Sequence, residues 1–253
     1  MKKIIIVLLC VFSILIGHIA YNISGGVSGL REDIGLEIKA RFNPKLRTIL
    51  NNKNQYPDTM IQALYRNEEL IDFVYNYPSK KGHVYTNIIG PVTKGRYPLL
   101  LQYDQRWGYG KYGHNVIGMN GCGPTSAAMI IAGLTGRNNI TPFDVASYAY
   151  NHGYYQDGTS WAFFTEGMKH YGIHGRKIPL SYSSMKNEIM NGRPLICSMK
   201  PGDFTTTGHL IVIRGMKQGM FIVNDPNSIK RSNCLWSYDT LSKQIRNIWS
   251  FSR

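Results

Sequence analysis

The sequence is poor in the residues and motifs that several large classes of protein require. Only four cysteines occur in 253 residues and none forms a CxxC pair, which argues against a disulfide scaffold and against a zinc module. No GxxxxGK[ST] phosphate-binding loop is present, so an ATP-driven transporter and a kinase are excluded. Acidic residues are also scarce, with 15 Asp plus Glu against 29 Lys plus Arg. The chain is nevertheless 43% apolar, as expected of a folded protein.

The excess of basic residues indicates an anionic neighbour. The formal net charge is +14, and it is still +12 without Lys2 and Lys3, so the excess belongs to the folded part. Nucleic acid is the first partner that such a charge suggests. However, the sequence has no zinc-finger spacing, no RNP-like aromatic motif and no dense run of Lys and Arg. We therefore expect no nucleic-acid partner and instead expect an anionic wall polymer or membrane surface.

The first 21 residues have the pattern of an export signal. Lys2 and Lys3 precede an uncharged apolar stretch that begins at Ile4. Up to Tyr21 this stretch has about 18 residues, just enough for a helix to cross ~30 Å of hydrocarbon. No clear small-x-small cleavage site follows, so residues 1–21 are predicted to be a signal peptide or an uncleaved signal anchor. In either case the positive-inside rule places the rest of the chain outside, either anchored at the extracellular face or secreted.

The rest of the chain divides into two regions. Residues 22–97 are predicted to be a linker plus a small helical accessory region. Within it, residues 22–54 have weak periodicity, which is typical of a spacer. The apolar residues that follow recur at helical spacing, with a break near Asn67 and an end at Pro78. Residues 98–253 are predicted to form the main domain.

In the main domain, helix signals come first and strand signals follow. A strand-like apolar run, Leu99–Leu101, leads to Gln102. Helices are predicted from Cys122 to Gly136 and over residues 142–151, 161–171 and 182–190, with Gly153, Gly172 and Gly192 ending the last three. Strands are predicted over residues 194–199, 209–213 and 220–225, the last two as a β-hairpin. Helices followed by antiparallel strands indicate an α+β fold.

Cys122 lies in a setting that is unusual for a structural thiol. Glycine stands on both sides of it, so a backbone or a substrate can approach closely. The predicted helix directs its N-terminal N–H groups at the sulfur, which stabilises a thiolate. Cys197, in contrast, lies inside an apolar run, as a buried structural cysteine does. Cys122 is therefore the candidate nucleophile.

His209 is the candidate base because it follows a glycine at the start of an apolar strand. In an antiparallel hairpin, directly opposed residues have a constant index sum and share a face. With a three- or five-residue loop centred on Lys217, His209 is opposite Asp225, whose carboxylate would orient the imidazole. With an even loop, the amide of Asn224 is opposite instead. We favour Asp225.

A thiol hydrolase also needs a donor for the oxyanion of the tetrahedral intermediate. Gln102, at the end of the apolar run upstream of the cysteine helix, is the candidate, together with the backbone N–H of Cys122. Gln105 is the rival. Each residue alone is a weak signal, but the order of Gln, Gly-Cys-Gly, Gly-His and Asn-Asp-Pro is specific.

These residues resemble the free-standing, bacteriocin-leader-processing-like (C39-like) branch of the papain-type cysteine peptidases. The similarity rests on residues 101–104 with Trp107, 121–126, 208–209 with Gly215, and 224–226. The resemblance covers about residues 98–250. It implies a papain-like α+β fold in which a helix carrying the nucleophile packs on an antiparallel sheet. It also implies a thiolate–imidazolium pair of Cys122 and His209, an orienting Asp225 and an oxyanion-hole Gln102. The spacing from Gln102 to Cys122 and the lack of an ATPase separate this chain from the transporter-linked members.

The function expected is that of an exported cysteine peptidase that hydrolyses amide bonds in an extracellular peptide, with no cofactor. One alternative keeps the same site but places the substrate in cell-wall peptides, as a peptidase or amidase. Another is a non-catalytic surface binding module with a papain-like shell. No metal is expected, because His152, His170 and His174 lack partners at metal-ligand spacing. Cys197 and Cys234 could pair, although their distance is not fixed by the sequence.

Overall fold

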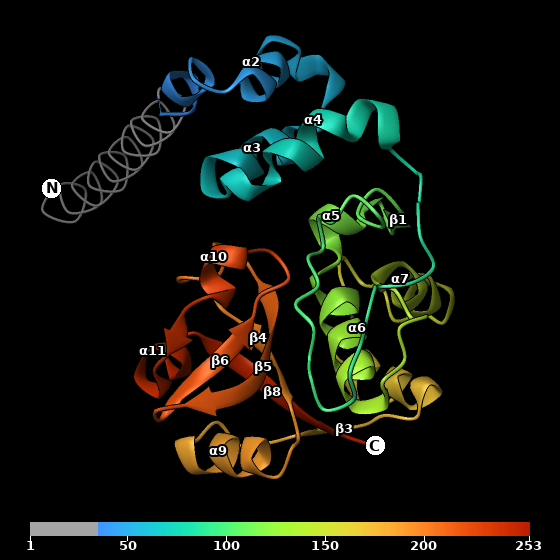
Figure 1. Ribbon diagram of the computed structural model, residues 1–253, viewed down its shortest axis with the longest axis vertical. Coiled ribbons are helices and arrows are strands. Elements are labelled where there is room, and N and C mark those ends of the chain that lie inside the picture. The colour runs from blue at the N-terminus through green and yellow to red at the C-terminus, as the bar shows by residue number, and fades with distance from the viewer. Residues whose placement is uncertain (1–34) are drawn as a thin grey trace, which may run out of the picture. The chain divides into compact units, whose positions relative to one another are not determined.

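The computed structural model describes residues 35–253, and its chain divides into two compact units at Tyr75 and Asn76 (Figure 1). The predicted signal segment, residues 1–21, lies outside the described residues. Within residues 35–253 no helix is long and apolar enough to cross a bilayer.

The described part of the first unit is helical throughout. Helical backbone over residues 35–40 corrects the spacer predicted for residues 22–54, as do the next elements. Asn43 caps the following helix by accepting from Leu46 N, and Pro44 occupies its first turn. Capping thus fixes the start of this helix, and Leu46 and Ile49 are its buried residues. The elements are α2 (Pro44–Asn51), η1 (Lys53–Gln55), α3 (Asp58–Arg66), η2 (Glu68–Leu70) and α4 (Ile71–Lys80), which crosses into the second unit.

The break predicted near Asn67 is confirmed, because this residue separates α3 from η2. The end predicted at Pro78 is two residues early: α4 continues to Lys80 with Pro78 inside its last turn. In that position proline removes only one N–H from the helix.

Cys122 lies at the start of the longest helix of the second unit. Before it come β1 (Lys111–Tyr112), β2 (Asn115–Val116) and α5 (Ile117–Asn120). The cysteine helix is α6 (Cys122–Thr135), closed by Gly136 with a left-handed φ of 78°, as predicted. Thr141 caps α7 (Pro142–Asn151) in a capping box with Asp144. Ser181 caps α9 (Tyr182–Met190) by accepting from Ser184 N.

Two predicted elements of this unit are wrong. The run before Gln102 is a loop and not a strand, and the backbone N–H of Gln102 bonds Pro226 O at 2.7 Å. The helix predicted over residues 161–171 is split into α8 (Ala162–Thr165) and η3 (Gly167–Tyr171). Gly167 follows the break, and a Cβ there would lie 2.4 Å from the ring of Phe163, so glycine allows this close approach.

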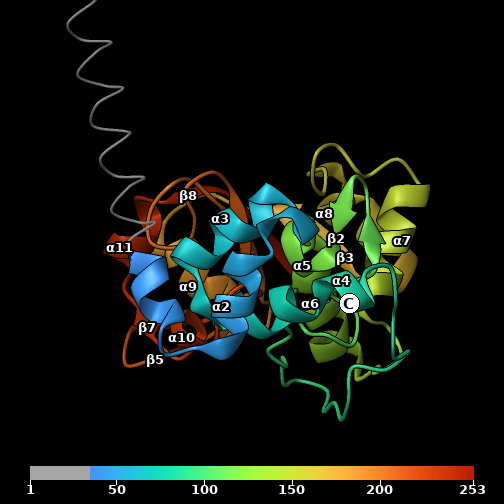
Figure 2. The ribbon, with the colours of Figure 1, turned by 90° about the horizontal axis from the view of Figure 1, so that it is seen from above.

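Six strands of the second unit form one antiparallel sheet in the order β3-β8-β4-β5-β6-β7, and β1 pairs with β2 separately. Its faces are covered differently: Ile196 and Val212 pack in the core that includes α6 and α7, whereas Cys197 and Ile211 pack in the core that includes α9 and α11. Figure 2 shows the helices α6, α7 and α8 together on one side of this unit. The strands and remaining helices are β3 (His174–Lys177), β4 (Leu195–Met199), β5 (His209–Lys217), β6 (Met220–Asn224), α10 (Ile229–Ser232), β7 (Leu235–Trp236), α11 (Tyr238–Ser242) and β8 (Ile245–Ser252).

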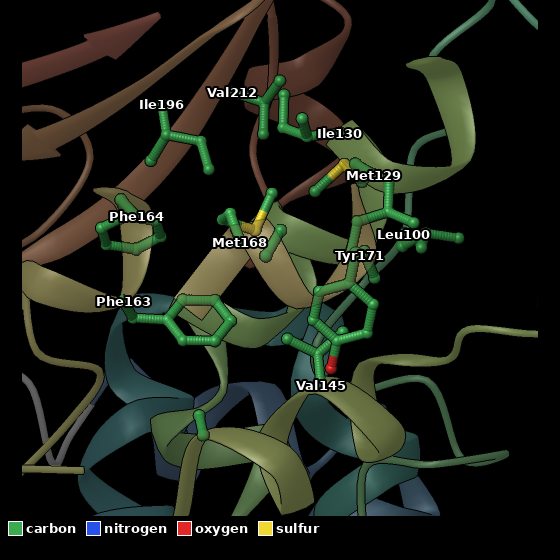
Figure 3. Packing of buried hydrophobic residues seen from close by; sticks show 14 of the residues in the cluster. Leu100, Met129, Ile130, Val145, Phe163, Phe164, Met168, Tyr171, Ile196 and Val212 are labelled. Atoms are coloured by element: carbon green, nitrogen blue, oxygen red, sulfur yellow. The ribbon is translucent and has the colours of Figure 1, made fainter. Parts of the chain in front are cut away.

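The core between α6 and the sheet fixes the position of the cysteine. Figure 3 shows Met129 and Ile130 of α6 near Val212 of β5, and Phe163 near Met168 in the same cluster. Every residue of α6 from Gly123 to Gly133 is buried, so the helix is covered on all sides. The prediction of an α+β fold, with the cysteine helix packed on an antiparallel sheet, is confirmed.

Candidate active site

Cys122 is the first residue of α6, and its side chain is partly exposed. Its neighbours are tightly packed: a Cβ on Gly123 would lie 2.2 Å from Thr159 Oγ1, so only glycine fits there. Thr159 in turn bonds the hydroxyl of Tyr112 at 2.7 Å. The nucleophile candidate therefore lies on a rigid helix start that remains open to a reactant.

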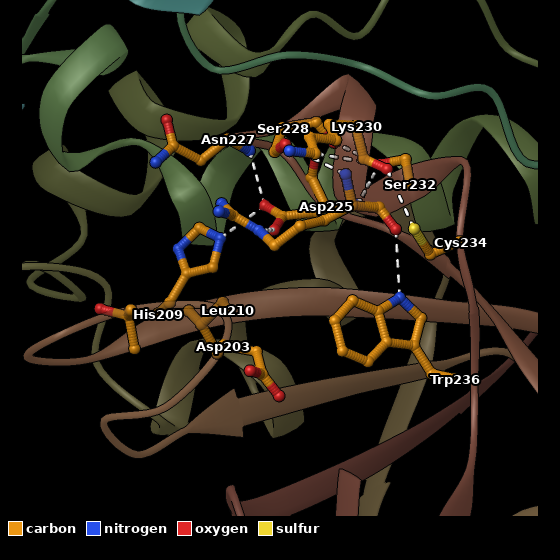
Figure 4. Close-up of polar contacts among 12 residues, drawn as sticks. Asp203, His209, Leu210, Asp225, Asn227, Ser228, Lys230, Ser232, Cys234 and Trp236 are labelled. Atoms are coloured by element: carbon orange, nitrogen blue, oxygen red, sulfur yellow. Dashed lines mark hydrogen bonds and ion pairs between the residues drawn. The ribbon is translucent and has the colours of Figure 1, made fainter. Parts of the chain in front are cut away.

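His209 is the sheet residue that lies near this cysteine. It is the first residue of β5, it is buried, and Cys122 is near enough to affect its ionisation. Its Nε2 lies 2.7 Å from Asp225 Oδ1, which leaves Nδ1 for the sulfur (Figure 4). Burial alone would lower the pKa of His209. The charge and hydrogen bond of Asp225, together with Cys122, outweigh this effect and raise the pKa to about 10.

Asp225 is fully buried just beyond the end of β6. Burial opposes its ionisation, but His209 and Arg231 keep its pKa below the usual value. Oδ1 also accepts from Asn227 N at 2.7 Å, and Oδ2 accepts from Arg231 Nε at 2.5 Å. Both oxygens of the carboxylate are therefore held.

The hairpin register that led to this pair is wrong, although the pair itself is present. The turn is Gln218-Gly219, with Lys217 opposite Met220, and it has positive φ at both residues as in a type I′ turn. The register shifts between Ile213 and Gly215. Val212 is then opposite Asn224, so His209 and Asp225 are not direct cross-strand partners.

Asn224, the alternative to Asp225, bonds elsewhere. Its amide accepts from Arg214 Nε at 2.8 Å and donates to the carbonyls of Tyr97 and Pro98 at 3.2 and 3.0 Å. The residue that bonds His209 is therefore Asp225.

Gln102 is buried and connects the two halves of the site. Its Nε2 donates to Gly118 O of α5 at 2.9 Å, and its backbone N–H bonds Pro226, which follows Asp225. Its Oε1 is buried without a hydrogen-bond partner among residues 35–253. The rival Gln105 accepts from Asn76 and Lys80. Of these two glutamines, only Gln102 links the segments that carry Cys122 and Asp225.

A cavity of about 490 Å³ is lined in part by Thr159, the residue that lies against Gly123. Tyr154, Gln156, Ser160 and Trp161 also line it. Trp161 is exposed, so aromatic and hydrogen-bonding groups are both available to a ligand.

The other thiols differ from Cys122. Cys197 is buried, which raises the pKa of its thiol, and Cys234 is exposed. Both are free, so the disulfide left open by the sequence is not formed. Over the described range no group of three His, Cys, Asp or Glu side chains is placed to hold a metal ion. His152 and His170 instead stack on Tyr148.

The sequence model of one protein family, described as the Peptidase_C39 like family, matches residues 94–252. The chain belongs to this family of cysteine peptidases. The resemblance found in the sequence is thus confirmed, as is the expectation of a cysteine peptidase.

Solved structures of C39 peptidases match as well. One is the peptidase domain of Streptococcus ComA, a bifunctional ABC transporter of a quorum-sensing pathway, with 18% identity and a TM-score of 0.44, covering 62% of this chain and 96% of that one. Another is a protein from Bacillus anthracis described as a C39-like peptidase, with 14% identity and a TM-score of 0.37, covering 65% and 98%. A comparison with curated proteins finds no match.

Sequence reasoning missed two parts of this candidate site. Arg231 comes six residues after Asp225 in a basic stretch that looks like exposed surface. Tyr112 and Thr159 come from loops that the sequence does not place near Cys122. The Asn-Asp-Pro sequence indicates a turn after β6, but it does not predict that the side chain of Arg231 bonds Asp225.

Proposed function

We propose that this C39-like peptidase hydrolyses peptide bonds through Cys122, His209 and Asp225, with Gln102 as an oxyanion donor. The observation that supports this most strongly is the position of His209, whose Nε2 bonds Asp225 Oδ1 at 2.7 Å and whose pKa responds to both Asp225 and Cys122. A nucleophile, a base and a residue that orients the base are the parts that covalent amide hydrolysis requires.

The reaction follows from this order of residues. The Cys122 thiolate attacks the carbonyl carbon, and the negative charge moves to the oxygen beside Gln102 and the Cys122 N–H. The C–N bond then breaks while the His209 imidazolium gives its proton to the leaving amine. A water next attacks the thioester as His209 takes its proton, which releases the acid and restores the thiolate.

The proposed substrate is an extracellular peptide. The proposed location of the enzyme is the outer face of the membrane or the medium. The apolar segment from Ile4 to Tyr21 behind two lysines supports this location. Protease added to intact producing cells should digest a C-terminal epitope on the protein. Complete protection of the epitope in intact cells, with digestion after lysis, would refute the location.

Hydrolysis is tested by incubating the full-length protein with a mixture of synthetic peptides and labelling new amino termini. New termini should form with the wild type and not with Cys122→Ser. Equal cleavage by both proteins would exclude Cys122 as the nucleophile.

A cell-wall substrate is the second candidate, because a net charge of +14 suits binding to anionic wall polymers. Incubation of purified wall with the full-length protein discriminates the two. New amino termini on wall peptides alone would favour this candidate, and termini on the soluble peptides alone would favour a secreted-peptide substrate.

A further inference from the structure

Asp225 has a second cationic partner besides His209. Arg231 Nε lies 2.5 Å from Asp225 Oδ2, on the side of the carboxylate opposite to the oxygen that bonds His209. The carboxylate is fully buried, and the Arg231 side chain is 22% exposed. A guanidinium so placed acts on the carboxylate with little screening by water.

The segment after β6 holds Arg231 in this position. Ser228 caps α10 by accepting from Arg231 N at 3.1 Å, and Trp236 Nε1 donates to Arg231 O at 3.1 Å (Figure 4). Ser232 Oγ accepts from Asp225 N at 2.8 Å and donates to Ser228 O at 2.7 Å. The turn therefore closes on itself, and the backbone of Arg231 is fixed relative to the carboxylate.

The proposed reaction creates a need for such a partner. During each cycle the His209 imidazolium gives away its proton, and Asp225 is then a buried anion facing a neutral ring. A buried charge without a partner is costly and tends to be neutralised by a proton. Arginine stays charged at any pH at which the protein is folded. A carboxylate paired with it remains an anion whether the imidazole is charged or neutral.

Resting on the proposed function, we infer that Arg231 is a positioning residue that acts through Asp225. It fixes the carboxylate and keeps it ionised through the cycle, and it shares the negative charge that would otherwise act on His209 alone. The consequence is a less basic imidazole, which returns its proton to the leaving amine more readily.

The sign of the effect distinguishes this role from a merely structural one. The charged or titratable groups that act on Asp225 are His209 of β5 and Arg231 of α10, and those that act on His209 are Asp225 and Cys122 of α6. Removing the guanidinium charge leaves more of the Asp225 charge to stabilise the imidazolium, so the pKa of His209 rises. Loss of a structural anchor instead lets Asp225 turn away, so the pKa falls.

The test is an NMR titration of the His209 ring nitrogens in the full-length Cys122→Ala protein. This background removes the contribution of Cys122 and the need for a substrate, so the result does not depend on whether Cys122 is a nucleophile. Arg231→Gln should raise the midpoint of His209 by about one pH unit. Arg231→Lys should leave it within about 0.3 units, because the charge is kept.

Arg214→Gln is the matched control, since this arginine lies on β5, the strand of His209, and bonds the amide of Asn224 instead of a carboxylate. It should leave the midpoint unchanged. If Arg231→Gln does not fold, Arg231→Ala with added ethylguanidinium takes its place: the midpoint should fall on addition of the cation and not with sodium chloride of equal ionic strength. An unchanged or lowered midpoint in Arg231→Gln, or a raised one in Arg231→Lys, would overturn the inference.

Discussion

His209 Nε2 lies 2.7 Å from Asp225 Oδ1 although the two residues are not directly opposed in the β5–β6 hairpin. His209 begins β5 and Asp225 follows the end of the antiparallel strand β6. Both residues therefore lie where the strands end, on the same side of the sheet's edge formed by those strand ends. That edge is where the start of α6 brings Cys122. The contact therefore depends on where the strands end more than on the register between them.

Replacing Asp225 by asparagine should weaken the base without dismantling the site. The amide side chain still reaches the imidazole, but the charge that raises the pKa of His209 to about 10 is lost, so this pKa falls. We expect kcat/KM to drop about 10²-fold, with Asp225→Ala lower still. Hydrolysis rates across pH 5–9 measure both effects. A fully active Asp225→Asn with an unchanged pH profile would contradict the role of the carboxylate.

Gln102→Ala should separate hydrolysis from thiol reactivity. Loss of one oxyanion donor lowers kcat by about 10²–10³-fold. Alkylation of Cys122 forms no oxyanion, so its rate should change little. Gln105→Ala is the control, because its amide bonds Asn76 and Lys80, and it should hydrolyse as the wild type does. If both glutamine variants lose hydrolysis equally, Gln102 is not the specific donor.

The tight packing behind the cysteine predicts a coupled pair of substitutions. Gly123→Ala places a methyl group 2.2 Å from Thr159 Oγ1 and should destabilise the protein by about 2 kcal/mol. Thr159→Gly in the same chain removes the clash, so the double variant should be more stable than the sum of the single changes. Urea unfolding of the four proteins measures the coupling. Simple additivity would show that the two sites do not touch.

Glu188 predicts how stability depends on pH. Burial opposes its ionisation, but Arg193, Ser250 and Arg176 bond the carboxylate at 2.6 Å each and lower its pKa to about 2. Because the folded pKa lies below the unfolded one, this stabilisation is complete above about pH 4.5 and is lost as the pH falls towards 2. Glu188→Gln should therefore lower the free energy of unfolding by about 2 kcal/mol at pH 7 and by less at pH 3. The loss is no larger because both arginines are partly exposed to water, which weakens the ion pairs.

Urea unfolding at both pH values measures this difference. Glu166→Gln is the control, because its pair with Lys169 is exposed, and it should cost less than about 1 kcal/mol at either pH. A cost of Glu188→Gln that is the same at pH 7 and pH 3 would contradict the assigned ionisation.

Local chemistry made much of this molecule predictable from its sequence. Gly-Cys-Gly-Pro placed the start of α6, Thr141 and Ser181 placed two more helices, and Gly136 ended the first. These signals act within one turn of chain, where side chain and backbone meet directly. The order of Gln102, Cys122, His209 and Asp225 added the candidate site, and the last three of these residues each stand at the end of an element or beside one.

Features that depend on long-range packing were missed. The hairpin register was set by a two-residue turn at Gln218-Gly219 and by a bulge in β5 between Ile213 and Gly215, instead of by a loop centred on Lys217. Helices before residue 52 formed from weakly periodic sequence because Leu46 and Ile49 are buried, which is decided by tertiary contacts. The contact of Arg231 with Asp225 could not be predicted for the same reason. The single turn of α10 decides whether the guanidinium faces water or Asp225.

The nucleophile is tested most directly by iodoacetamide alkylation of the full-length protein near neutral pH, with the modified cysteines located by peptide mapping. Cys122 should react faster than exposed Cys234, and buried Cys197 should react only after unfolding. His209→Ala should bring the rate of Cys122 down to that of Cys234. Equal labelling of Cys122 and Cys234 in the wild type, unaffected by His209→Ala, would contradict the thiolate–imidazolium pair.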